Sequence, residues 1–187
     1  VGKRDRYSGE MHVSSTAKRR IGSGTAGKLV TEVKRRMGSA TEDVELAVID
    51  GSPGIGCPVI ASISGVDMVL IVAEPSLSGI SDMERIVKTA ESFHVITAVC
   101  VNKADVNPAK TEEILSFCRA RGIPFAGVIP FDAEAVKAIN SGKNIAELDM
   151  PSVRAVRKVY ENGMELLWKE AKQHDHKSAV GEHGGIG

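Results

Sequence analysis

The sequence predicts an α/β fold, with a mostly parallel sheet and helices on both of its faces. Apolar runs of strand length alternate with amphipathic stretches of helical length, and polar or glycine-rich loops follow the runs. Runs that are apolar throughout are typical of strands buried on both faces, as in parallel sheets. With 187 residues, of which 42% are hydrophobic, the chain is long enough for one domain with a substantial core.

The first half of the chain is expected to contain two helices and two strands. Apolar residues at helical spacing predict a helix over 27–37, and a short apolar run predicts a strand over 46–49. Pro58 suits a first helical position, so a short helix is expected over 58–64. The run DMVLIVA at 67–73 predicts the second strand.

The second half repeats the same alternation. Apolar periodicity predicts a helix over 81–93, and the run at 95–101 predicts a third strand. A helix over 110–121 is expected to stop at Gly122, because glycine readily adopts the left-handed conformation that ends helices. The remaining expected elements are a strand over 123–129, a helix after Asp132 that ends near 140, and an amphipathic helix from 151 to about 174.

The loops that follow the four expected strands should share one edge of the sheet. Crossovers between parallel strands are right-handed, so the strands run the same way and their carboxyl ends lie together. Ligands of open α/β sheets bind at that edge. The loops concerned are 50–56, 74–78, 102–105 and 130–132.

The first of these loops, DGSPGIG, begins with an aspartate. An acid at the end of a buried strand suits a Mg²⁺ site, because it offers a hard oxygen that binds the ion directly or through water. Gly51, and Gly54 after Pro53, would let the backbone come close to a phosphate. A tight turn after a core strand explains the glycines equally well.

The third loop, Asn102-Lys103-Ala104-Asp105, matches the base-reading NKxD element of nucleotide-binding G domains. An asparagine amide can pair with ring nitrogens, and a fixed carboxylate can accept from an exocyclic amine. The same four residues also suit an ordinary polar turn. Their combination with the Asp50 loop makes nucleotide binding the more specific interpretation.

A second glycine-rich stretch, GSGTAGK at 22–28, has the spacing of a phosphate-binding loop. Leu29 stands where that motif requires a serine or threonine hydroxyl for Mg²⁺, and no buried strand precedes the stretch. We therefore expect it to lead into the helix at 27–37 and not to bind phosphate.

Composition excludes several classes of partner. Basic and acidic residues number 24 each, so the net charge is zero and favours neither a nucleic acid nor a membrane surface. Aromatic residues make up 4%, too few for a base-stacking platform. The three cysteines, at wide spacing, fit neither a disulfide framework nor a zinc or cluster motif, so a reducing, cytoplasmic location is expected. No apolar run is long enough to span a membrane.

The runs DGSPGIGCPV, VCVNKAD and GVIPFD together resemble the MinD/ParA superfamily of deviant P-loop ATPases (the SIMIBI class). The likeness is greatest to the ferredoxin-containing (4Fe-4S) MinD-type proteins and the Mrp-like cluster carriers, and it covers about residues 23–149. The resemblance implies ATP and Mg²⁺ as cofactors, with Asp50 in the Mg²⁺–water shell and 51–54 as a switch that senses the γ-phosphate. It also implies that Asn102 contacts adenine and that 130–132 lie beside the base. The nucleotide-binding residues it implies are Asp50, Gly51, Pro53, Gly54, Asn102, Lys103, Asp105, Pro130, Phe131 and Asp132.

The sequence differs from this family on the N-terminal side of the matched region. In the family that side contains a lysine-containing phosphate loop, the first switch and the ferredoxin module that holds the [4Fe-4S] clusters, and this sequence has no counterpart of them. We therefore expect the carboxyl-terminal part of such a protein, with a fold incomplete on its N-terminal side. Residues 1–22 would be a linker, 23–172 the ATPase portion and 173–187 a flexible tail rich in histidine and glycine.

Partners and activity follow from that expectation. The expected partner is a second copy in a homodimer or a completing N-terminal polypeptide, and an iron-sulphur or metallocofactor protein would be the client. The chain would belong to an ATPase when complete and would be inactive alone. In the family fold another strand separates the strands at 46–49 and 67–73, so we expect a gap there, filled by a partner segment or by residues near 11–13.

Three alternatives remain open at this stage. NKxD also reads guanine in GTPases, although Gly54 stands four residues after Asp50, as in the MinD-like group, where GTPases place it three after. The chain could also be a non-catalytic, partner-binding remnant of the fold, or share only the fold, as the dethiobiotin synthetase-like enzymes do.

Cys57 could be a redox or cluster-contacting thiol, whereas Cys100 and Cys118 are expected to be small buried apolar residues.

Overall fold

The computed structural model describes residues 46–51 and 56–181, with side chains up to residue 169. The chain divides into two units, Val1–Val66 and Asp67–Gly187, and each is described by itself. The expected helix at 27–37 and the loop residues 52–55 lie outside the described residues.

In the first unit, the helix α2 (Cys57–Ile63) forms close to its expected position and buries Val59 and Ile63. The predicted strand at 46–49 is wrong, because residues 46–51 form no strand and Val48 is 76% exposed. A strand needs a neighbouring strand to satisfy its backbone N–H and C=O groups, and so short an apolar run does not form one without a partner.

The second unit contains a three-stranded parallel sheet in the order β1 (Met68–Ala73), β2 (Ile96–Asn102) and β3 (Phe125–Ile129). Each strand lies within two residues of its expected range, and the predicted parallel sheet is confirmed. The middle strand is the most buried, with Ala98–Val101 fully buried, as continuous apolar character predicts.

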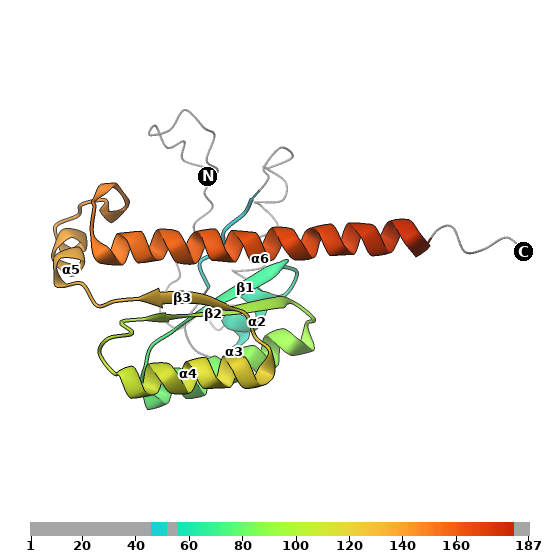
Figure 1. Ribbon diagram of the computed structural model, residues 1–187, viewed down its shortest axis with the longest axis horizontal. Coiled ribbons are helices and arrows are strands. Elements are labelled where there is room, and N and C mark those ends of the chain that lie inside the picture. The colour runs from blue at the N-terminus through green and yellow to red at the C-terminus, as the bar shows by residue number, and fades with distance from the viewer. Residues whose placement is uncertain (1–45, 52–55, 182–187) are drawn as a thin grey trace, which may run out of the picture. The chain divides into compact units, whose positions relative to one another are not determined.

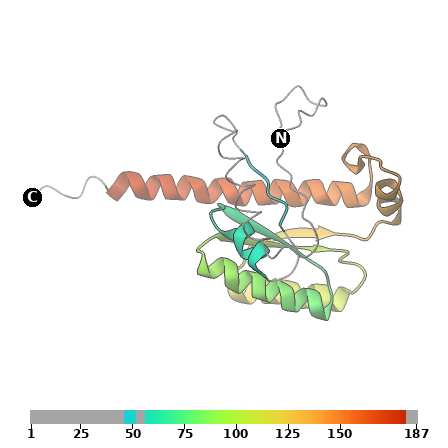
Figure 2. The same cartoon turned by 180° about the vertical axis from the view of Figure 1, so that it is seen from behind.

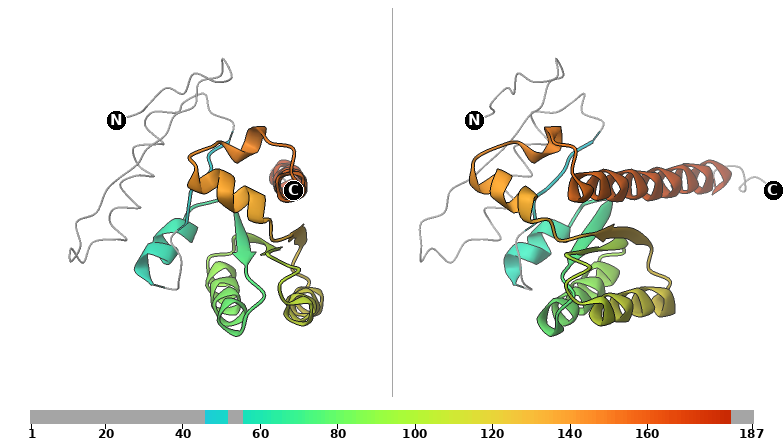
Figure 3. Two further views of the ribbon diagram at one scale, coloured as in Figure 1. Left: turned by 90° about the vertical axis from the view of Figure 1, so that its left-hand side faces the viewer. Right: turned by 60° about the vertical axis from the view of Figure 1, so that its left-hand side comes forward.

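Helices cover both faces of this sheet, again as predicted. Figures 1 and 2 show α3 (Leu77–Ser92) and α4 (Pro108–Arg121) on one face and α6 (Pro151–Gly181) on the other, and Figure 3 shows the same layers end-on. The core on the α3–α4 side consists of Ile71, Ala73, Ile80, Met83, Val87, Val99, Val101, Ile114 and Cys118. On the α6 side a smaller cluster joins Cys100, Ala126 and Val159. The last two elements, α5 (Ala133–Asn140) and η1 (Ile145–Glu147), connect β3 to α6.

The helix boundaries differ from the expected ones where a side chain caps the first turn. The helix α3 begins at Leu77 because the Ser76 hydroxyl accepts a hydrogen bond from the Gly79 N–H at 3.0 Å. Asn107 caps α4 in the same way, and Gly122, with φ of 65°, ends that helix as predicted. The last helix, α6, continues to Gly181, past the expected end near 174.

Within the described residues, β1 pairs with β2 alone, so its other edge has no strand beside it. Leu70 and Val72 on this strand are 36% and 57% exposed, although the run reads as a buried strand. The expected gap beside β1 stays a prediction.

Gly79 provides a test of how closely α3 approaches the end of β1. A Cβ atom at this position would lie 2.3 Å from the backbone oxygen of Glu74. Because both groups are backbone-anchored, Gly79→Ala should destabilise the chain by about 1–3 kcal/mol in urea unfolding. Gly163→Ala in α6 is the matched control, since its Cβ would meet only the Met68 methyl at 3.6 Å. The control should raise stability by up to about 1 kcal/mol, and equal effects of the two substitutions would refute the close approach.

Candidate functional site

Three loops meet at the carboxyl edge of the sheet, where the sequence predicts a binding site. Glu74 follows β1, residues 102–105 end and follow β2, and residues 130–132 follow β3. The strands are parallel, so these loops lie at the same edge, and a side-chain hydrogen bond joins each neighbouring pair of loops. The prediction that 74–78, 102–105 and 130–132 share one edge is confirmed.

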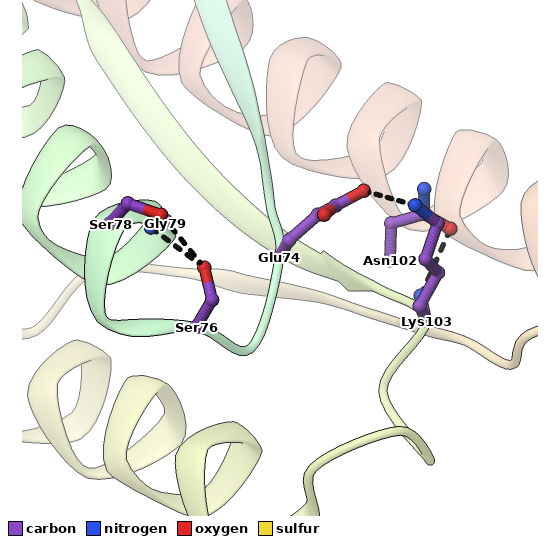
Figure 4. Close-up of polar contacts among 6 residues, drawn as sticks. All are labelled: Glu74, Ser76, Ser78, Gly79, Asn102 and Lys103. Atoms are coloured by element: carbon purple, nitrogen blue, oxygen red, sulfur yellow. Dashed lines mark hydrogen bonds and ion pairs between the residues drawn. The ribbon is translucent and has the colours of Figure 1, made fainter.

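An ion pair connects the ends of β1 and β2. Figure 4 shows Glu74 extending toward Lys103, with Oε1 of Glu74 2.7 Å from Nζ of Lys103. Both side chains are about half exposed, at 52% and 44%, so the pair contributes at most about 1 kcal/mol. Glu74 was not among the predicted site residues, although it follows an apolar run just as Asp50 does.

Lys103 has an unusual backbone conformation, with φ of 55°. Its N–H donates to Oδ1 of the preceding residue, Asn102, at 3.0 Å (Figure 4). A left-handed non-glycine residue costs of order 1–3 kcal/mol and tends to occur at functional sites. Oδ1 of Asn102 is thereby occupied, while its amide nitrogen makes no hydrogen bond with the residues that the structure describes.

The loops after β2 and β3 are joined more firmly. Oδ1 of Asp105 accepts from the backbone N–H of Phe131 at 2.6 Å. The Ala104 N–H donates to the Ile129 carbonyl at 3.0 Å, and the Thr111 hydroxyl donates to the Ala104 carbonyl at 2.7 Å. Hydrogen bonds to a charged acceptor are the stronger kind, so the carboxylate of Asp105 is a main tie between these loops.

Asp132 fastens the third loop to two helices. Its Oδ1 accepts from the N–H groups of Glu134 and Ala135 at 3.1 and 3.2 Å, which caps α5. Its Oδ2 accepts from the hydroxyl of Ser152, a buried residue at the start of α6, at 2.9 Å. The Ser152 hydroxyl, followed by the Ala135 N–H, lowers the pKa of the Asp132 carboxyl from its ordinary value of 3.8. Both oxygens of Asp132 therefore have structural partners.

An open cavity of about 570 Å³ lies beside the joined loops. This volume is within the usual range for small-molecule sites. The lining is mainly apolar and comes from α4, the end of β3 and the start of α6. Its residues are Ala104, Asp105, Pro108, Thr111, Glu112, Val128, Pro130, Pro151 and Ala155.

The other predicted site residues belong to the first unit. Asp50 and Gly51 are exposed, so core side chains do not enclose the Asp50 carboxylate. Pro53 and Gly54 lie outside the described residues. Cys57 is exposed at the start of α2.

The two remaining cysteines behave as expected of small core residues. Both are buried in the second unit, and burial raises the pKa of the Cys100 thiol to about 11 and that of Cys118 above its ordinary value. Within the ranges 46–51 and 56–169, no group of three or more His, Cys, Asp and Glu side chains is arranged to hold a metal ion. Nor does any helix of the described part have both the length and the apolar character to cross a membrane.

The comparisons with known proteins agree with this geometry. No protein-family model matches the chain. It is 27% identical over 149 residues to the uncharacterised protein MJ0578 of Methanocaldococcus jannaschii, covering 79% of the chain and 49% of that protein. The uncharacterised ATP-binding protein MJ0547 of the same organism is 26% identical over 124 residues, covering 62% of the chain and 45% of that protein. The chain thus spans about half the length of these relatives.

A shorter match and a solved structure add to these. The cytosolic Fe-S cluster assembly factor Nubp1 homolog of Drosophila melanogaster is 33% identical over 57 residues, covering 30% of the chain and 18% of that protein. The structure of the MinD cell division protein of Aquifex aeolicus aligns with a TM-score of 0.61 at 20% identity, covering 74% of the chain and 61% of that protein. The structural likeness establishes the fold.

The fold is an α/β fold with a parallel sheet, like that of the solved MinD structure. Over part of its length, the chain is also similar in sequence to an ATP-binding protein and to the septum site-determining protein MinD of Helicobacter pylori, which is 24% identical over 143 residues.

The Asp132–Ser152 contact gives a pH dependence with a definite sign. The pKa of the Asp132 carboxyl is lowered by folding, so its stabilising effect is present above about pH 4 and is lost as the pH falls through the lowered value. Asp132→Asn keeps a capping oxygen but removes the charge. It should therefore be less stable than the wild type at pH 7, and the difference in the free energy of unfolding should shrink as the pH falls below about 4.

Urea unfolding at a series of pH values measures this difference. Ser152→Ala removes the hydroxyl that donates to Asp132 and contributes most to its lowered pKa. Both Ser152→Ala and Asp132→Asn should therefore weaken the dependence of the free energy of unfolding on pH. Parallel pH curves for the wild type and both variants would show that the contact does not influence the carboxyl.

Proposed function

We propose that the chain is the carboxyl-terminal part of a MinD-like ATP-binding protein and that its loop edge holds the base of the nucleotide. The observation that carries the proposal is the meeting of 102–105 and 130–132 at the carboxyl edge of a parallel sheet, joined by the hydrogen bond between Asp105 and Phe131. The similarity to MJ0547, an uncharacterised ATP-binding protein, supports ATP as the ligand.

Asn102 is the residue that contacts adenine in this proposal. It ends the central strand β2, where the backbone is fixed by pairing on both sides. Its Oδ1 accepts from the Lys103 N–H, which orients the amide so that its nitrogen can donate to a ring nitrogen. Pro130 and Phe131 lie beside the base, and Phe131 offers it a ring that is 48% exposed.

The phosphates and Mg²⁺ belong to the Asp50 loop in this proposal. The Asp50 carboxylate is exposed and offers the hard oxygen that Mg²⁺ prefers, with water completing the coordination. Bound Mg²⁺ would neutralise charge on the phosphates. Gly51, Pro53 and Gly54 form the switch that responds to the γ-phosphate, and a completing N-terminal polypeptide supplies the phosphate loop.

A role in delivering iron-sulphur clusters or another metallocofactor is the proposed biological context. It is supported by the match to the Nubp1 homolog, a cytosolic Fe-S cluster assembly factor. Within the part of the chain that the structure describes, no cluster site is formed, since Cys100 and Cys118 are buried and Cys57 has no other cysteine in the first unit. The client or an additional module would hold the cluster, with Cys57 as the thiol available to contact it.

Photolabelling with 8-azido-ATP and Mg²⁺ tests the proposed base site, because crosslinking detects binding even when affinity is low. Mapping by mass spectrometry should find the label in peptides that contain 102–105 and 130–132, and ATP should compete with it better than GTP. Asn102→Ala should reduce labelling about tenfold through the lost hydrogen bond.

Asn140→Ala is the matched control, an exposed asparagine at the end of α5, and it should label as the wild type does. Label found only outside the two loops, or equal loss in both variants, would refute the proposed base site. Tighter competition by GTP would assign the site to guanine.

A further inference from the structure

We infer that Asp105 is a positioning residue that selects against guanine, because its carboxylate holds the 130–132 loop and is not free to read a base. The inference rests on the proposed nucleotide site and assigns to Asp105 a role opposite to the one that NKxD has in GTPases. The structural basis is the 2.6 Å hydrogen bond from the Phe131 N–H to Oδ1 of Asp105.

The contact joins two loops that are 26 residues apart in sequence, and few other bonds hold them together. The Ala104 N–H donates to the Ile129 carbonyl, which fixes the beginning of the 130–132 loop. Asp132 fixes its end, through α5 and Ser152. Between these two anchors, the Phe131 N–H is held by Asp105, so the carboxylate determines where the Phe131 backbone and ring lie.

The geometry of Asp105 itself is set from its other side. The Thr111 hydroxyl donates to the Ala104 carbonyl at 2.7 Å, which ties the residue before Asp105 to the first turns of α4. Thr111 is only 8% exposed, so this tie is shielded from water. The residue before Asp105 is thus bound to α4, and the Asp105 carboxylate accepts from the 130–132 loop. This arrangement suits Asp105 to hold that loop in place.

Base selection follows from the chemistry of the two purines. Guanine presents two neighbouring donors, N1–H and the N2 amine, and a carboxylate reads them by turning both oxygens toward the base. In this chain Oδ1 of Asp105 accepts from the Phe131 N–H, so the carboxylate cannot turn both oxygens toward a base and keep this contact in its present geometry. Guanine would gain its second bond only by releasing Phe131.

The experiment separates the loop tie from the choice of nucleotide by using two readouts on the 187-residue chain. The first readout is amide hydrogen exchange of Phe131 followed by ¹H–¹⁵N NMR without nucleotide. In Asp105→Ala the exchange should speed up about tenfold or more, because a charge-assisted bond is lost. Asp105→Asn keeps an acceptor oxygen, so its exchange should remain much closer to that of the wild type.

The second readout is competition by ATP and GTP against 8-azido-ATP labelling of the same variants. Asp105→Asn should keep the preference of the wild type for ATP, and Asp105→Ala should lose affinity for both nucleotides as the loop is released. Asp82→Ala in α3 is the matched control, since Asp82 is half exposed and its carboxylate lies 4.0 Å from the Arg85 guanidinium. It should change neither readout.

The outcomes distinguish the inference from the proposal beneath it. Unchanged Phe131 exchange in Asp105→Ala overturns the inference, whatever the nucleotide data show. Loss of GTP competition in Asp105→Asn, with tighter GTP than ATP in the wild type, overturns it too, since that is the behaviour of a guanine-reading carboxylate. A wild-type chain that takes no label refutes the proposed function and the base selection with it, while the exchange measurement still decides whether Asp105 holds the loop.

Discussion

The parallel pairing of β2 with both of its neighbours is the constraint on which the second unit depends. Residues 98–101 of this strand are fully buried, so its backbone groups have no access to water and must be paired on both sides. Parallel pairing requires a crossover helix between successive strands, and it brings every strand's carboxyl end to one edge. The candidate site therefore follows from the same hydrogen bonds that build the core.

Much of this arrangement could be predicted from sequence, because its signals are local. Continuous apolar runs located the strands of the second unit, and Gly122 located the end of α4. The sequence did not predict where α3 and α4 begin. The side chains of Ser76 and Asn107 cap these helices by accepting from the backbone N–H three residues further along, whereas the apolar pattern starts later. The run at 46–49 has the composition of a strand, yet composition cannot supply the neighbouring strand that it needs.

The site was predicted as a set of residues and not as a set of contacts. The sequence predicted that 102–105 and 130–132 lie at one edge of the sheet. It did not predict that Asp105 accepts from the Phe131 N–H or that Asp132 accepts from the Ser152 hydroxyl. Those partners are 26 and 20 residues apart and carry no motif. In the structure, oxygens of both aspartates accept hydrogen bonds that hold the loops.

This division of labour among the polar residues is what a binding edge requires. Loops that hold a ligand must keep their shape in water, and the hydrogen bonds of Asp105 and Asp132 contribute to that shape. Asn102 is different, because the neighbouring strand positions fix its backbone while its amide nitrogen remains available. Among the described residues of this edge, the carboxylates of Asp105 and Asp132 hold the loops, and the Asn102 amide nitrogen is the group that the proposed recognition of adenine uses.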